Sequence, residues 1–156
     1  MQTWFPIEAT PENALPAVSV AYSHCHSLDT ANALFDEILP KSSADASIPR
    51  FTFWSHKGTE EYVECSFAGI ESVKGVDVYW YNDKDTGGKC HLPESWSVQW
   101  RPAKDAPWRR IEGDCPVRNN QFSSFEFPAA VKAQALRFNV KLQPELSAGI
   151  LEMRIK

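Results

Sequence analysis

The chain has 156 residues, with 16 Lys and Arg against 20 Asp and Glu, a formal net charge of −4, and 43% hydrophobic residues. This length fits one domain with a core of its own, and the composition excludes a disordered or collagen-like chain. No apolar run approaches the roughly 18 residues of a membrane span. A mildly acidic chain without a basic block is a poor nucleic-acid binder. We therefore expect neither a membrane span nor a nucleic-acid partner.

The first segment, residues 1–16, carries Pro6, Pro11 and Pro16 among scattered acids, which predicts an extended lead-in or linker. It has no basic start followed by an apolar core, so it is not typical of a signal peptide. We expect a domain excised from a longer protein, whose own targeting the segment does not reveal. Residues 17–156 are predicted to form a single domain.

The first part of this domain alternates only briefly. Residues 17–21 have the pattern of a short strand, and residues 29–35 that of one helical turn. Residues 36–50 contain Pro40, Pro49 and a Ser-rich cluster, which predicts a long loop. A loop of this length in a compact domain is usually functional or organised by an ion.

A series of strands follows, each with apolar residues at every second position. The alternating runs are residues 61–67, 76–81, 96–100, 125–127, 136–142 and 151–156. Turn residues separate them at 85–88, 101–102, 113–114, Pro128 and Pro144. Half-polar alternation indicates antiparallel strands with one buried face and one face in water. The sequence therefore predicts an all-β protein, an antiparallel β-sandwich or jelly roll, with Trp80, Trp96 and Trp100 in its core.

Four cysteines, Cys25, Cys65, Cys90 and Cys115, stand at irregular spacings. Cys65 lies on the apolar face of an alternating run, which favours a buried free thiol. A Cys25–Cys90 disulfide is an open alternative. The clusters at residues 24–26 and 90–91 combine His and Cys, but adjacent residues on a strand point to opposite faces, which disfavours a zinc site.

Three stretches resemble the galactose-binding-like, or discoidin (coagulation factor V/VIII type C), β-sandwich domains. They are residues 32–36 with 50–54, residues 61–67 with 76–80, and residues 92–96 with 136–140 and 148–155. The segment from Pro40 to Gly58 resembles such domains appended to bacterial glycoside hydrolases, of the β-L-arabinofuranosidase-like and chitobiase or hexosaminidase-like kinds. The resemblance covers roughly residues 17–156.

The resemblance implies one structural Ca²⁺ held between an early Asp loop and the final strand. It assigns Asp36 and Glu152 as the carboxylates, and Ca²⁺ prefers such oxygen ligands. The chain departs from the family pattern because Glu37 stands where a Gly usually follows the Asp. The alternative is that Asp36 caps a turn and Glu152 faces water.

The resemblance also implies a sugar site at one end of the sandwich, built from an aromatic face and a few polar donors. The candidate residues lie in loops: Arg50, Trp54, His56, Lys57, Asn82, Asp83, Lys84, Asp85, His91 and Trp108. Other interpretations stay open, since Trp54 closes an alternating run like a core residue and Arg50 has acids nearby. The run from Asn82 to Asp85 is also typical of a solvated turn.

The sequence contains no nucleophile elbow, zinc-protease motif or phosphate loop, so no enzymatic activity is predicted. The first hypothesis is a carbohydrate-binding accessory domain of a secreted or periplasmic glycoside hydrolase, with a glycan and the parent's catalytic domain as partners. The alternative is a structural docking domain that packs on the catalytic domain and binds no glycan.

Overall fold

The computed structural model describes residues 3–5, for which only the backbone is described, and residues 18–156. Its elements, in chain order, are β1 (Thr3–Phe5), β2 (Val18–Tyr22), η1 (Ala31–Phe35), β3 (Phe51–Thr52), β4 (Glu60–Tyr81), η2 (Lys84–Thr86), β5 (Ser95–Arg101), β6 (Arg109–Arg110), β7 (Ser123–Lys141) and β8 (Gly149–Ile155). The two η elements are short 3-10 helices. Apart from β1, which pairs antiparallel with β2, the predicted lead-in lies outside the described residues.

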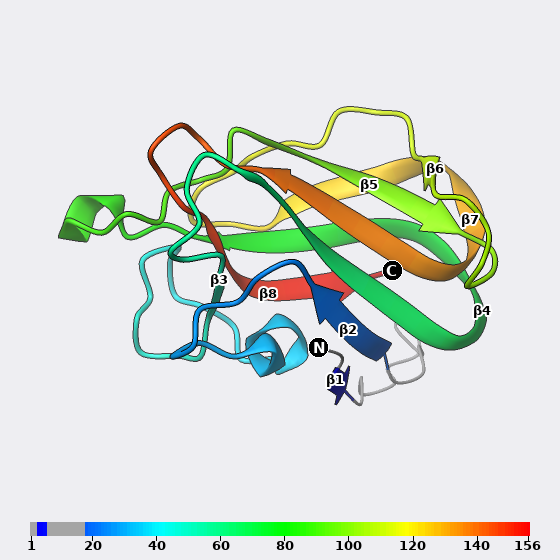
Figure 1. Ribbon diagram of the computed structural model, residues 1–156, viewed down its shortest axis with the longest axis horizontal. Helices are drawn as coiled ribbons and strands as arrows, with labels where there is room; N and C mark the ends of the chain where they lie inside the picture. Colours follow the sequence, from blue (N-terminus) through cyan, green and yellow to red (C-terminus); the bar gives the residue numbers. More distant parts are fainter. Residues whose placement is uncertain (1–2, 6–17) are drawn as a thin grey trace.

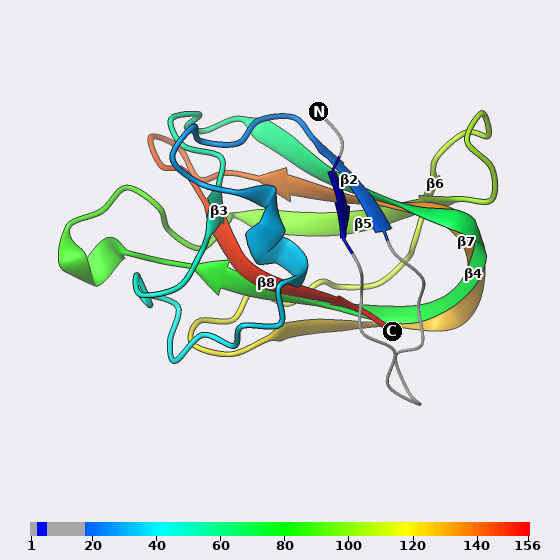
Figure 2. The same cartoon turned by 90° about the horizontal axis from the view of Figure 1, so that it is seen from below.

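The strands form two layers that share β4 and β7 (Figures 1 and 2). In one layer the first part of β4 pairs with β2 and with the second part of β7, which also pairs with β5. In the other layer the second part of β4 pairs with the start of β7 and with β8, and β8 pairs with β3. All these pairings are antiparallel. The predicted β-sandwich is confirmed.

Both shared strands continue through a bend where the sequence predicted separate strands. The pairing of β4 with β7 shifts register between Ser66 and Glu71 and again between Val73 and Gly75. Such bulges bend a strand without ending it. The turn predicted at Pro128 is wrong, because Pro128 lies inside β7 near this bend. The two-residue strand β6 was not predicted.

The layers enclose a core of tryptophan and phenylalanine. Trp80 and Trp96 are buried, with ring centroids 5.8 Å apart, and Trp96 stacks on Phe138 at 6.4 Å. Cys65 is fully buried and free, as predicted. The prediction for Trp100 is wrong in part, because its ring is half-buried against the core edge with the Arg109 guanidinium 5.2 Å above it.

The outer face of the second layer is also buried, although its alternation predicted contact with water. Tyr79 and Tyr81 form a second apolar cluster with Cys90 and Leu151. Ile48, from the long loop, packs on this cluster. A register shift between Tyr79 and Trp80 in the β4–β8 pairing displaces the alternation, so Leu151 lies in this cluster and not in the core with Met153. In the described residues no helix is long and apolar enough to cross a membrane.

Candidate functional site

The end of the sandwich opposite the β4–β7 bend lies on the left in Figure 1. A pocket of about 320 Å³ opens among the segments that meet there. Three segments far apart in the sequence line it: the loop after β2, the chain around β3, and the end of β4 with the loop that follows. Its lining residues are His26, Asp29, Arg50, Thr52, Trp54, Tyr81, Asp83, Gly88, Lys89 and Cys90. The pocket thus contains three predicted ligand-binding residues, Arg50, Trp54 and Asp83.

Alternation along β3 explains why these side chains face the pocket. Phe51 and Phe53 are fully buried in the core. Successive side chains of an extended chain point to opposite sides, so Arg50, Thr52 and Trp54 face the other way. The same short segment therefore supplies both core and site.

A chain of hydrogen bonds fixes the polar wall of the pocket. The Arg50 guanidinium donates through Nε to Asp29 Oδ1 at 3.3 Å and through Nη1 to Tyr81 Oη at 2.8 Å. Tyr81 Oη donates in turn to Asp83 Oδ2 at 3.3 Å, and Asp83 Oδ1 accepts from the Cys90 amide at 2.9 Å. Arg50 thus pairs with an acid, as one interpretation held, and still lines the pocket.

In this wall the Arg50 guanidinium is paired with the Asp29 carboxylate but keeps N–H groups available to a ligand. Asp29 is buried, with 4% of its side chain exposed, and it also accepts a hydrogen bond from Thr52 Oγ1. The Arg50 side chain is 38% exposed. A guanidinium carries five N–H groups, so these two bonds leave donors available to a ligand. Burial, followed by the nearby Asp83 carboxylate, raises the pKa of Tyr81 to about 12, so its hydroxyl stays protonated.

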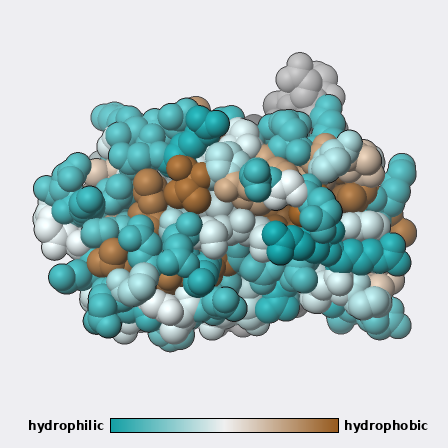
Figure 3. Space-filling view, turned by 90° about the horizontal axis from the view of Figure 1, so that it is seen from above, coloured by the Kyte–Doolittle hydropathy of each residue, from teal (hydrophilic) through white to brown (hydrophobic). Residues whose placement is uncertain are grey.

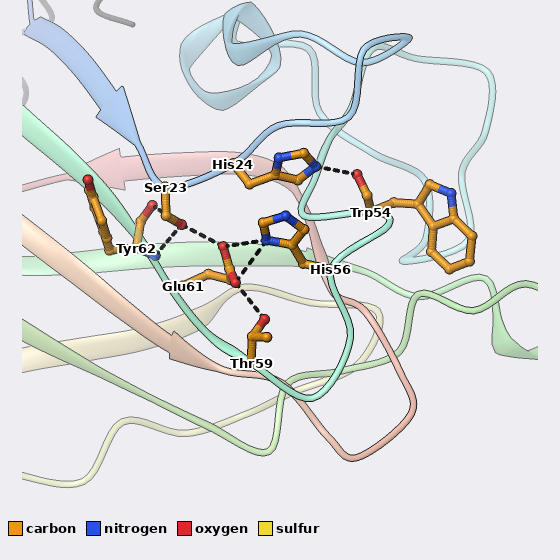
Figure 4. A network of polar contacts seen from close by, with 7 residues as sticks. All are labelled: Ser23, His24, Trp54, His56, Thr59, Glu61 and Tyr62. Atoms are coloured by element: carbon orange, nitrogen blue, oxygen red, sulfur yellow. Dashed lines mark hydrogen bonds and ion pairs between the residues drawn. The ribbon is translucent and has the colours of Figure 1, made fainter.

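An aromatic wall completes the pocket. Trp54 is half-buried, so the interpretation of this residue as core is wrong. Its indole points away from the neighbouring His24 and His56 in Figure 4. The exposed Lys57 places its Nζ 6.0 Å from the centroid of the Trp54 ring. Lys57 therefore lies beside the pocket, although it is not part of the lining.

A second polar network holds the Trp54 segment against the end of β2 (Figure 4). His24 Nε2 donates to the Trp54 carbonyl at 2.8 Å, and the His24 ring stacks on His56 with centroids 3.8 Å apart. His56 Nδ1 lies 3.1 Å from Glu61 Oε2. Since a carbonyl only accepts, His24 must carry its proton on Nε2. His56, a predicted ligand-binding residue, belongs to this network and is not part of the pocket lining.

Glu61 is the acceptor at the centre of the network. Burial alone would raise the pKa of this carboxylate, but hydrogen bonds from Thr59, Ser23 and His56 hold it below its ordinary value. Ser23 Oγ donates to Glu61 Oε1 at 2.8 Å, and Thr59 Oγ1 donates to Oε2. The ionised Glu61 joins the start of β4 to the end of β2 and so positions Trp54.

The other predicted ligand-binding residues lie outside the pocket. Asn82 donates through Nδ2 to Asn119 Oδ1 at 3.1 Å. Asp85 is exposed on η2, and the His91 amide donates to the Ser147 carbonyl at 3.1 Å. Lys84 is exposed on η2, and Trp108 lies on a different face, under the Arg101 guanidinium at 4.2 Å.

The other seven lining residues were not predicted from the sequence; they are His26, Asp29, Thr52, Tyr81, Gly88, Lys89 and Cys90. Gly88 is required because a Cβ atom there would lie 1.9 Å from Asp83 Cγ. Its place in a Gly pair after an acidic turn was the available hint. Tyr81 stands at a position of its strand that the alternation predicts to face water. Only the structure shows that a loop covers it and that it lines the pocket.

The two predicted calcium ligands do meet. Glu152 is 2% exposed, so the interpretation that it faces water is wrong. Its Oε2 accepts from the Glu37 amide at 3.2 Å, and its buried Oε1 has no hydrogen-bond partner among the described residues. Burial, and then the neighbouring Asp36, raise the pKa of Glu152 to about 9. Asp36 is only partly buried, and its Oδ1 accepts from the Ile38 amide at 3.0 Å, so it caps a turn as the alternative held. Two adjacent carboxylates, one with a buried oxygen that lacks a partner, still offer the oxygen ligands that a hard cation prefers.

No larger metal-binding cluster is found. The described residues bring no three His, Cys, Asp or Glu side chains together in a group that could hold a metal ion. All four cysteines are free thiols. Neither the zinc site nor the Cys25–Cys90 disulfide is present in this arrangement, and a cation between Asp36 and Glu152 would need backbone carbonyl or water ligands as well.

Comparison with known proteins depends on structure, since no family model and no curated protein matches the sequence. A chain of the Streptococcus pneumoniae β-galactosidase BgaA superposes with a TM-score of 0.74 at 16% identity, over 99% of this chain and 98% of that chain. The family 32 carbohydrate-binding module of Clostridium perfringens NanJ, solved with galactose, superposes with a TM-score of 0.63 at 10% identity, over 88% of this chain and 92% of that one.

The fold is that of the galactose-binding-like sandwiches. A third structure of this kind is chitosan-binding module 1 from a chitosanase/glucanase of Paenibacillus sp. IK-5, with a TM-score of 0.63 at 13% identity over 88% of this chain and 92% of that one. The TM-scores establish a common fold, and at identities of 10–16% what this chain binds must be argued from the site.

Proposed function

We propose that this chain is a carbohydrate-binding module, a non-catalytic accessory domain of a larger secreted glycoside hydrolase. The observation that carries the proposal is the loop-end pocket, where a half-exposed Trp54 faces the fixed polar chain of Arg50, Tyr81 and Asp83. Solved structures with this fold include the chitosan-binding module of a chitosanase/glucanase and the family 32 carbohydrate-binding module of NanJ, which supports the same role here.

The pocket has the chemistry that a sugar ring requires. The indole of Trp54 offers an apolar face for the C–H surface of a pyranose or furanose. Arg50 and Lys89 donate to ring hydroxyls, and Asp83 accepts from them. The cations Arg50 and Lys89 are offset by Asp29 and Asp83, which suits a neutral monosaccharide unit.

Binding of one sugar by this pocket is expected to be weak. A small polar ligand buries little apolar area against the cost of association, so millimolar dissociation constants are expected. Attachment to a catalytic domain that holds the same polysaccharide compensates through a high effective concentration. From the resemblance of the segment from Pro40 to Gly58, we propose a parent enzyme of the β-L-arabinofuranosidase-like or hexosaminidase-like kind, acting outside the cell or in the periplasm.

Calorimetric titration of the chain with galactose, L-arabinose and N-acetylglucosamine tests the proposal. At least one sugar should bind, and Trp54→Ala should weaken it at least about tenfold, which corresponds to about 1.4 kcal/mol. Trp108→Ala is the matched control, since it removes an equal side chain on another face and should leave this binding intact. Loss of binding in Trp108→Ala but not in Trp54→Ala, or no binding of any sugar at millimolar concentrations, would contradict the proposal.

We also propose that Asp36 and Glu152 hold one structural Ca²⁺. When bound, the ion would replace the proton that the pair otherwise needs, because two adjacent carboxylates cannot both stay ionised without a counter-charge. Ca²⁺ should therefore raise the melting temperature of the wild-type protein, which has both carboxylates. An Asp36→Asn variant should lose this response, and an equal rise in wild type and variant would refute the assignment.

A docking role is the second candidate, favoured by one apolar feature. Ile38 and Leu39 are 43% and 57% exposed, beside a pocket of about 280 Å³ that Phe35, Met153 and Ile155 help to line. On the face drawn in Figure 3, by contrast, hydrophobic residues form small separate patches in a largely hydrophilic surface. If docking is the role, Leu39→Ser should weaken a complex with the separately expressed catalytic domain, measured by sedimentation, and sugar titrations should stay silent.

A further inference from the structure

The outer face of the first layer carries a polar groove that the proposed sugar site does not use. It has a volume of about 550 Å³ and crosses β4, β7, β5 and β6. Tyr62 on β4 lies opposite Asn139 on β7, and Asn139 lies opposite Ser97 on β5. One row further along, Arg137 lies opposite Gln99, which lies opposite Arg110 on β6.

Aromatic rings and guanidinium groups alternate at one side of this groove. The Arg137 guanidinium lies 4.0 Å from the centroid of the Tyr62 ring and 6.0 Å from that of Trp108. The Arg101 guanidinium also lies over the Trp108 ring, 4.2 Å from its centroid. Such stacking holds a guanidinium plane in place while its N–H edge stays free for an anion.

The hydrogen-bonding groups of the groove are only partly satisfied. Asn139 Nδ2 donates to Gln99 Oε1 at 2.8 Å, which leaves the side-chain oxygen of Asn139 and the side-chain amide NH₂ of Gln99 for a ligand. The Nε groups of Arg101 and Arg137 are buried without a hydrogen-bond acceptor in the part of the chain that the structure describes. A ligand can reach these side chains only at their exposed part, and 27% of the Arg137 side chain is exposed.

Only some of the basic side chains on this face are paired with acids. Arg137 pairs with Glu64 at 3.2 Å, and Lys141 pairs with Glu94 at 2.9 Å. Arg101 and Arg110 have no ion pair among the described residues. Two further acids, Glu60 and Glu61, line the groove, and Glu61 is bound to Ser23, His56 and Thr59. The guanidinium groups of Arg101 and Arg110 are therefore the ones available to an anionic ligand.

We propose that this groove binds an acidic polysaccharide, one whose sugars bear carboxylates, independently of the loop-end pocket. Guanidinium groups match carboxylates with two parallel hydrogen bonds, whereas amide and hydroxyl groups match sugar hydroxyls. Four adjacent strands span about 14 Å, at about 4.8 Å between neighbours. The groove therefore accepts several consecutive sugar units and not a single ring.

Titration with a short oligogalacturonate, followed by amide shifts in the NMR spectrum, tests this inference. The expected result is saturable binding with shifts at Gln99 and Asn139, weakened at least about tenfold by Arg110→Gln. Arg110 is exposed, so this variant should keep the wild-type melting temperature. Trp54→Ala should leave the binding unchanged, which separates this groove from the loop-end pocket whether or not that pocket binds sugar.

Three further arms decide between occupants. The carboxyl-reduced oligomer of the same length should bind at least about tenfold more weakly, and raising NaCl from about 0.1 M to about 1 M should weaken the acidic oligomer, since screening shortens the range of exposed charges. Equal binding of polyglutamate would show that an acidic polypeptide is the occupant and would overturn the inference. A dimer that Arg110→Gln dissociates, or loss of binding in Trp54→Ala alone, would overturn it as well.

Discussion

The buried Glu152 gives the sharpest thermodynamic prediction. Its carboxyl is almost inaccessible to water, contacts Asp36, and has a pKa raised from 4.5 to about 9 by burial and by that neighbour. In the unfolded chain the same group ionises near its ordinary value. Between the two values the folded protein therefore holds a proton that the unfolded protein releases.

The sign and size of the effect follow from this difference. Because the native state binds more protons, its stability in the absence of Ca²⁺ must fall as the pH rises from about 4.5 towards about 9. Each pH unit in this window costs about 1.4 kcal/mol, so the loss approaches about 3 kcal/mol at pH 7. Glu152→Gln keeps the shape of the side chain but has no proton to lose. This variant should therefore be more stable than wild type at pH 7, by up to the same amount.

Urea denaturation followed by tryptophan fluorescence, in EDTA, measures this difference at about pH 5, 7 and 8.5. Glu112→Gln, at an exposed glutamate, is the control and should follow the wild-type curve. Adding Ca²⁺ should restore the stability of wild type at high pH and leave Glu152→Gln unchanged. A wild type whose stability is level or rises across this range, or a variant with the same slope as wild type, would refute the reasoning.

Three other substitutions test the core and the site. Trp80→Ala should cost about 3–5 kcal/mol of unfolding free energy through the cavity it leaves, and a loss below about 1 kcal/mol in denaturant titrations would mean that the core is misassigned. Gly88→Ala should displace the Asp83 carboxylate and abolish calorimetric sugar binding, so binding as in wild type would argue against the pocket. His56→Ala should lower stability by about 1 kcal/mol, because Glu61 keeps two hydroxyl donors, and a melting temperature unchanged within error would show that the network does not position Trp54.

The fold was predictable because the alternation of apolar and polar residues along each strand shows which face is buried. Val63, Cys65 and Phe67 alternate with Tyr62, Glu64 and Ser66, and each side chain lies on the face that its polarity predicts. The layers themselves were less visible, because β4 continues through residues 68–75 by bulges, and Gly69 and Gly75 in that segment are as typical of a turn as of a bulge. A one-residue shift of register near Trp80 was enough to move Leu151 to the other face.

The site was only partly predictable for a related reason. Arg50, Trp54 and Asp83 could be named because they stand in loops with the right chemistry, and the structure brings them to one pocket. Tyr81 could not, since a tyrosine on the polar side of a strand has the same pattern whether it faces water or a covering loop. His56 has the chemistry of a ligand-binding residue, but it pairs with Glu61 and so helps to position the Trp54 segment.

The short segment around β3 shows why core and site cannot vary independently in this protein. Phe51 and Phe53 anchor the segment in the core, and their spacing forces Arg50 and Trp54 outward. Since the Trp54 carbonyl is also held by His24, the indole and the guanidinium have little freedom relative to each other. A ligand is therefore met by a surface that is already ordered, which lowers the entropy cost of binding and lets a small pocket recognise a small sugar.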